Sequence, residues 1–150
     1  MSVIYTKGNL LEANTAVIAH QANCQCTFGA GLALAIKKRF PDAYKEDLKT
    51  TKGDISKLGT FSISESKPIV ANLYGQFYYY PKGSTDYKAL ENALNLLGIY
   101  MTQNHLDSLG LPYKIGCGLG GGDWNKVKEI IENFALNHPN INIIIYEPLQ

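Results

Sequence analysis

Residues 116–122 of the sequence include five glycines. The stretch lies between a short apolar run, Leu111–Ile115, and a helical pattern over Asn125–Asn137. Glycine permits positive φ and lets a ligand approach the main chain closely, so backbone N–H groups can converge there on an anion. The N-terminal end of a following helix adds positive potential. The spacing therefore favours a phosphate-binding loop over a flexible turn.

A second glycine-containing loop, residues 21–31, follows the compact apolar run Thr15–His20 and precedes a helical pattern over Leu32–Phe40. Both glycine loops are thus expected to leave a strand and enter a helix. In open α/β sheets, ligands bind outside the carboxyl ends of the strands. We therefore expect both loops to line one cleft.

Strand-like and helix-like segments alternate along the chain. The patterns predict strands over 2–6, 15–20, 59–64, 69–74, 111–115 and 141–146, and helices over 32–40, 42–50, 86–105 and 125–137. The run 15–20 is apolar on both faces, which is typical of a strand in a parallel or mixed sheet covered by helices. The sequence predicts α/β layering in a single domain spanning residues 1–150.

Composition argues against several classes of protein. A net charge of +1 gives no electrostatic reason to expect nucleic-acid binding. No apolar stretch reaches the length of a membrane helix or a signal-peptide core, so neither a membrane nor secretion is expected. Three cysteines are an odd number, which indicates reduced thiols and a cytoplasmic protein. Cys24 and Cys26 lack a second pair to complete a zinc site, so no metal or cofactor is expected.

The glycine loops do not match the common phosphate-binding motifs. Neither contains the G-x-x-x-x-G-K-[ST] pattern of a P-loop. Gly116, Gly118 and Gly121 fit the letters of a dinucleotide fingerprint, but they occur late in the chain and no acidic residue ends a strand before Glu147. A serine nucleophile elbow is also missing. An ordinary dehydrogenase, P-loop enzyme or serine hydrolase is therefore not expected.

Three blocks of sequence carry a more specific signal. They are Lys7–Leu10, then Ala19–Cys24 with Phe28–Ala33 and Lys37–Pro41, then Pro112–Leu119 with Asp123 and Trp124. In this order and spacing they resemble the macrodomain family, in the branch that contains terminal ADP-ribose glycohydrolase and ADP-ribose 1''-phosphate phosphatase. The resemblance covers nearly the whole chain. It implies a three-layer α/β/α fold with a mixed, roughly six-stranded sheet and an ADP-ribose cleft at the strand ends.

The resemblance also assigns parts of ADP-ribose to residues. It implies that the distal ribose and a phosphate lie at the early loop, at Asn23, Phe28, Gly29, Ala30 and Gly31. The diphosphate would be wrapped by the late loop, at Gly116, Cys117, Gly118, Leu119, Gly120, Gly121 and Gly122. Adenine would lie near Gly8, Asn9 and Leu10. Many macrodomains have an aspartate where this chain has Asn9, and an amide accepts a hydrogen bond more weakly than a carboxylate. Tyr146 either packs on the base or merely ends the last strand.

The candidate catalytic residues differ between the two enzymes of that branch. The glycohydrolases use a lysine and an aspartate at positions where this chain has Gln76 and Gly120. The phosphatases have a histidine at the position of His20. An imidazole can transfer a proton at neutral pH, so His20 with a carboxylate from Asp86 or Asp123 forms the candidate catalytic set.

Three functions remain open from the sequence. The first is an enzyme that acts on an ADP-ribose derivative, either by removing a 1''-phosphate or as a glycohydrolase with a mechanism that does not use lysine. The second is a module that binds ADP-ribose without turning it over. The third is a partner-binding domain whose cleft holds no ligand. The first two share the glycine loops, and they differ in whether the candidate catalytic residues reach the distal ribose.

Overall fold

The computed structural model describes residues 2–79, 85–118 and 120–149. The strands are β1 (Ser2–Lys7), β2 (Val17–Ala22), β3 (Phe61–Ile63), β4 (Ile69–Tyr74), β5 (Ser108–Pro112) and β6 (Asn142–Glu147). The α-helices are α1 (Gly31–Arg39), α2 (Pro41–Leu48), α3 (Tyr87–Gln103) and α4 (Trp124–Asn137), and short 3-10 turns occur at η1 (Leu10–Glu12) and η2 (Ile55–Lys57). None of the helices in the described parts of the chain combines the length and the apolar character of a membrane-spanning segment.

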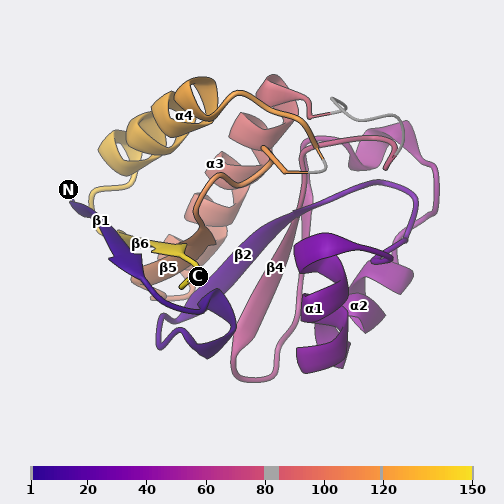
Figure 1. Cartoon of the computed structure of the whole chain (residues 1–150), viewed down its shortest axis with the longest axis horizontal. Helices are drawn as coiled ribbons and strands as arrows, with labels where there is room; N and C mark the ends of the chain where they lie inside the picture. The colour runs from indigo at the N-terminus through magenta and orange to yellow at the C-terminus, as the bar shows by residue number, and fades with distance from the viewer. Residues whose placement is uncertain (1, 80–84, 119, 150) are drawn as a thin grey trace.

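The six strands form one sheet in the order β1-β6-β5-β2-β4-β3. Neighbouring strands run parallel, apart from β3, which pairs antiparallel with β4 at the edge. In Figure 1, α3 and α4 lie together on one side of the strands and α1 and α2 on the other. The mixed sheet between two helical layers confirms the predicted α/β/α fold.

The strand β2 shows why both faces need a helical cover. Val17 and Ala19 belong to the core cluster beneath α3 and α4. Ile18 and Ala22 belong to the cluster beneath α1 and α2. Successive side chains of a strand point to opposite faces, so an uninterrupted apolar run buries both sides of the sheet.

The strand expected at 111–115 begins earlier in the chain, since β5 spans Ser108–Pro112. Gly110 interrupts the apolar pattern in the middle of this strand. The reason is a close approach: a Cβ at Gly110 would lie 2.8 Å from Thr15 Oγ1. Residues 113–117 instead form turns, with Ile115 N donating to Pro112 O and Cys117 N donating to Lys114 O.

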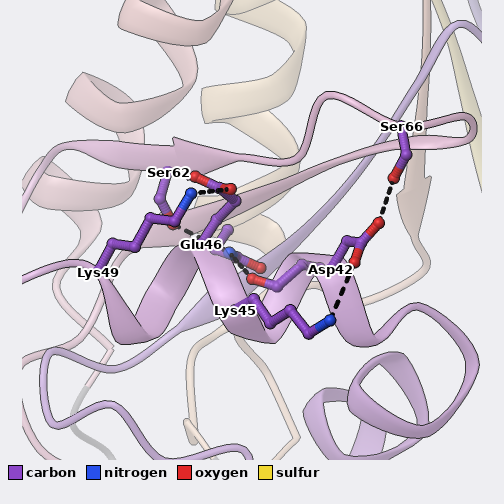
Figure 2. A network of polar contacts seen from close by, with 8 residues as sticks. Asp42, Lys45, Glu46, Lys49, Ser62 and Ser66 are labelled. Atoms are coloured by element: carbon purple, nitrogen blue, oxygen red, sulfur yellow. Dashed lines mark hydrogen bonds and ion pairs between the residues drawn. The ribbon is translucent and has the colours of Figure 1, made fainter.

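A surface network connects α2 to the chain between β3 and β4. Asp42 accepts a hydrogen bond from Ser66 Oγ at 2.7 Å and pairs with Lys45 at 3.7 Å. One turn later Glu46 pairs with Lys49 at 2.8 Å (Figure 2). Exposed pairs of this kind stabilise a protein by only about 0–1 kcal/mol, so the network orients α2 more than it holds the fold together.

Candidate functional site

A cavity of about 850 Å³ opens at the carboxyl ends of β2 and β5. Its volume lies within the range usual for small-molecule sites, about 300–1,000 Å³. Parallel strands bring the loops that follow them to the same edge of the sheet, and both glycine loops contribute to the wall. The lining residues are Gln21, Ala22, Asn23, Thr27, Gly29, Ala30, Gly31, Leu32, Ala33, Gln76, Tyr79, Pro112, Tyr113, Lys114, Ile115, Gly116, Gly118 and Gly120.

The early loop is held in shape by Asn23. Its Nδ2 donates to Thr27 Oγ1 at 2.9 Å and to Thr27 O at 3.1 Å, while its Oδ1 accepts from Gln25 N at 2.8 Å. Phe28 is buried beneath the loop, with its ring 5.2 Å from that of His20 and 5.0 Å from that of Tyr44. Asn23 and Phe28 therefore shape the loop, and Asn23 also contributes to the cavity wall.

The N-terminus of α1 opens into the cavity. Its N-cap residue is Ala30, which has extended backbone angles and no side chain that can cap the helix. Gly31, Leu32 and Ala33, the first residues of α1, line the cavity. The first N–H groups of a helix have no partner inside the helix, so α1 offers uncapped donors and its positive end to a ligand.

The late loop is a series of tight turns. Gly122 N donates to Gly116 O at 2.8 Å, and Gly121 N donates to Gly118 O at 3.0 Å. Gly116 and Gly121 have φ of +76° and +70°, which explains glycine at these two positions. The helix after this loop, α4, is capped: Asp123 Oδ1 accepts from Asn125 N at 2.9 Å. No residue of α4 lines the cavity, so of these two helices it is α1 that provides an open end there.

The three predicted catalytic residues do not lie in the cavity wall. His20 is 1% exposed, and its Nε2 lies 2.7 Å from Asn72 Oδ1. Burial lowers the pKa of His20 to about 4, so its imidazole is neutral at physiological pH. Asp86 caps α3 by accepting from Ala89 N at 3.0 Å, and Asp123 caps α4. Both carboxylates therefore serve as helix caps, and neither contacts His20 in the hydrogen bonds described. A catalytic role for the three residues stays a prediction.

The predicted adenine residues are not among the residues that line the cavity, although Tyr146 contacts the lining residues Pro112 and Tyr113. Asn9 Oδ1 accepts from Leu11 N at 3.0 Å and caps η1, so this side chain has a structural role in the turn. Leu10 is buried. Tyr146 pairs with Pro112 across β5 and β6, and its carbonyl accepts from the N–H of Tyr113. Gly8 lies close to the Tyr146 ring, at 3.8 Å from the position of an added Cβ.

Within the late loop, Gly116, Gly118 and Gly120 line the cavity. Cys117 is half-buried, and its Sγ donates to Ile115 O at 3.4 Å. Gly121 and Gly122 build the turns that follow. Leu119 lies outside the described residues.

The sequence did not predict Gln21 as a cavity residue. It drew attention to Gln76 only because the resembling glycohydrolases have a lysine at that position. Gln21 Nε2 donates to Gln76 Oε1 at 2.9 Å, and Gln76 Nε2 donates to Tyr78 O at 2.7 Å. The ionisable side chains of the described lining are Tyr79, Tyr113 and Lys114. In the parts of the chain that the structure describes, no three His, Cys, Asp or Glu side chains gather closely enough to hold a metal ion.

Comparison with known proteins places this architecture in a family. The chain is 34% identical over 157 residues to an uncharacterized 17.5 kDa protein of Enterobacteria phage T4, and the match covers 99% of both chains. It is 25% identical over 151 residues to a DNA ADP-ribosyl glycohydrolase of Thermus aquaticus, where the match covers 97% of this chain but 41% of the relative.

Among solved structures, the macrodomain of Mycobacterium tuberculosis DarG superposes with a TM-score of 0.83 at 21% identity, covering 96% of each chain. At that identity the likeness shows the fold alone. The Macro domain family profile matches residues 19–131. With most of its length matched by that profile, a six-stranded α/β/α fold and two glycine loops around one cleft, the chain belongs to the macrodomain family.

Proposed function

We propose that this protein binds ADP-ribose, either free or as an ADP-ribosyl group attached to another molecule. The observation that carries the proposal is the pairing of an uncapped helix end with a glycine loop on the walls of one cavity. The N-terminus of α1 contributes backbone donors from Gly31, Leu32 and Ala33, and the late loop contributes Gly116, Gly118 and Gly120.

A diphosphate fits this arrangement. Its oxygens accept several hydrogen bonds, and backbone N–H groups together with a helix dipole stabilise an anion without a buried cation. Lys114 is the one cationic side chain in the described lining, and it is exposed. The rest of the wall is apolar or neutral, which suits a ligand with two sugars and a base. A relative named for acting on ADP-ribosylated DNA supports the same ligand class.

Hydrolysis of an ADP-ribose derivative is the second candidate function, favoured by the name of that relative. The derivative is either ADP-ribose 1''-phosphate or an ADP-ribosylated molecule. Within the described lining, the titratable groups are two tyrosines and a lysine. A hydrolytic mechanism would therefore have to use Tyr79, Tyr113 or Lys114, or to recruit groups from outside this wall. Binding is the function that the geometry supports best.

The binding proposal is tested by replacing Ala30, which occupies the N-cap position of α1 without capping the helix. Ala30→Asp places a carboxylate at the N-cap, where it accepts from the first N–H groups of the helix and repels a phosphate. We expect ADP-ribose, titrated by calorimetry, to bind the wild-type protein and to bind this variant about ten to a hundred times more weakly. The melting temperature should stay the same or rise, because the helix gains a cap.

Thr51→Asp is the matched control, since it adds the same charge at an exposed position outside the cavity. It should bind ADP-ribose like the wild type. Absence of binding heat with the wild type at millimolar ADP-ribose would refute the proposal. Phosphate release from ADP-ribose 1''-phosphate and ADP-ribose release from an ADP-ribosylated DNA strand would then separate binding from hydrolysis.

A further inference from the structure

Three neutral side chains from separate parts of the chain meet behind the late loop. Gln21 belongs to β2, Gln76 follows β4, and Thr85 precedes α3. Gln21 Nε2 donates to Gln76 Oε1 and to Thr85 Oγ1, both at 2.9 Å. Thr85 Oγ1 in turn donates to Gly116 O at 2.7 Å. A continuous series of hydrogen bonds thus runs from the end of β4 to the first glycine of the loop.

Backbone contacts connect Thr85 to the loop a second time. Thr85 N donates to Gly120 O at 3.1 Å, and Gln76 and Thr85 form an isolated antiparallel bridge. Thr85 therefore engages the carbonyls of both Gly116 and Gly120. These hydrogen bonds hold both carbonyl oxygens toward Thr85, which does not line the cavity, whereas a carbonyl oxygen turned toward an anion would repel it.

The space around the three side chains is filled. A Cβ at Gly120 would collide with Thr85 Oγ1 and would also lie 2.8 Å from Gly116 O and 3.0 Å from Gln21 Nε2. A Cβ at Gly75 would collide with Gln21 Oε1. Position 120 therefore has no room for a carboxylate, and the side chain of Gln76 is committed to Gln21 and to Tyr78 O.

We propose that Gln21, Gln76 and Thr85 act as one positioning unit, in which Thr85 contacts the late loop directly, and that this unit holds the loop in the conformation that receives the ligand's diphosphate. The inference rests on the proposed function of the cleft. It assigns Gln76 a role in shaping the site, where the resembling glycohydrolases carry a catalytic lysine. Because the three side chains are uncharged, the unit is not altered by pH across the physiological range.

The test compares three variants of the full chain. Thr85→Val keeps the shape of the side chain but removes the acceptor for Gln21 and the donor to Gly116 O. Thr85→Ser restores the hydroxyl and serves as the rescue. Thr60→Val is the matched control, because Thr60 Oγ1 also donates to a backbone carbonyl, Lys57 O at 2.6 Å, and Thr60 does not line the cavity.

Two measurements are made on each variant: the Kd for ADP-ribose by calorimetry, and backbone amide hydrogen exchange at Gly121 and Gly122 without ligand. For Thr85→Val we expect a Kd raised about tenfold, the usual effect of losing one or two hydrogen bonds, with faster exchange at both amides. Thr85→Ser should stay within about threefold of the wild-type Kd, and Thr60→Val should leave both measurements unchanged.

An unchanged Kd in Thr85→Val overturns the inference, whatever the exchange rates are. Equal losses of ADP-ribose affinity in Thr85→Val and Thr60→Val also overturn the inference, because they would reflect general destabilisation. If the wild-type protein fails to bind ADP-ribose, the proposed function falls. The exchange rates at Gly121 and Gly122 then still decide whether Thr85 holds the loop, so the two failures are distinguishable.

Discussion

His20 and Asn72 are joined by a buried hydrogen bond of 2.7 Å between Nε2 and Oδ1. Asn72 Nδ2 donates to Ala43 O and to Ser62 Oγ, both at 2.9 Å, so both amide hydrogens of Asn72 are used. Oδ1 is therefore the acceptor, and the proton of the neutral imidazole lies on Nε2 of His20. The same network continues from Ser62 Oγ to Tyr74 OH at 2.7 Å. His20 thus belongs to a polar network that anchors the sheet to α2.

Acid should weaken the fold through His20. Below pH 6.5 the unfolded chain takes up a proton on this imidazole, whereas the folded protein resists it until about pH 4. The free energy of unfolding should fall as the pH drops through this window, by up to about 3 kcal/mol from this group. His20→Gln keeps a donor toward Asn72 but does not titrate. Its free energy of unfolding, measured with urea, should therefore fall less between pH 7 and pH 5 than that of the wild type. If the free energy of unfolding depends equally on pH in the two proteins, the pH dependence does not come from His20.

Removing the Tyr74 hydroxyl should destabilise the protein. Tyr74 OH donates to Asp47 Oδ1 at 2.6 Å, and Asp47 is fully buried with a pKa raised by that burial. Tyr74→Phe leaves the carboxyl group without this donor, which should cost about 1–3 kcal/mol in urea unfolding at neutral pH. Tyr44→Phe removes a 3.1 Å bond to Cys26 O in a less buried place and should cost less. A larger loss in Tyr44→Phe would argue against the importance of the buried pair.

An alanine at position 120 should be poorly tolerated although it is a small change. Its Cβ would collide with Thr85 Oγ1, and the backbone carbonyl oxygen of Gly116, 2.8 Å away, leaves it little room to move aside. We expect Gly120→Ala to lose about 1–3 kcal/mol of stability. Gly118→Ala is the control, because a Cβ there has no heavy atom within 4 Å. Thermal unfolding should show this difference, and similar melting temperatures for the two variants would show that the space at position 120 is not restricted.

The contact between α3 and α4 offers a test of packing away from the cleft. The ring of His138 lies over Gly98, so that a Cβ on this glycine would be 2.7 Å from the ring. Gly98→Ala should cost about 1–3 kcal/mol in the wild type, despite the better helix propensity of alanine. In a His138→Ala background the same change should be neutral or stabilising. A double-mutant cycle by urea unfolding measures this, and additive effects would mean that the ring is not the obstacle.

Much of the fold could be predicted from the sequence because it depends on local signals. The segment of β2 is apolar on both faces, which predicts a strand between two helical layers. The glycines of residues 116–122 predict a tight loop. Strand boundaries are predicted less accurately. Gly110 breaks the apolar pattern of β5 because the side chain of Thr15, which is far away in the sequence, leaves no room for a Cβ.

By itself, the sequence determined the α/β layering, the two glycine loops and the family, because periodicity, composition and motif spacing are properties of nearby residues. The tertiary structure decided which side chains meet at the cleft. Gln21 lies 55 residues from Gln76 and 64 from Thr85. Gln21 and Gln76 meet because β2 and β4 are neighbours in the sheet, and Thr85 joins them through its bridge to Gln76. It also decided that Asp86 and Asp123 cap helices and that α1 presents its open end, because hydrogen-bond partners depend on spatial neighbours.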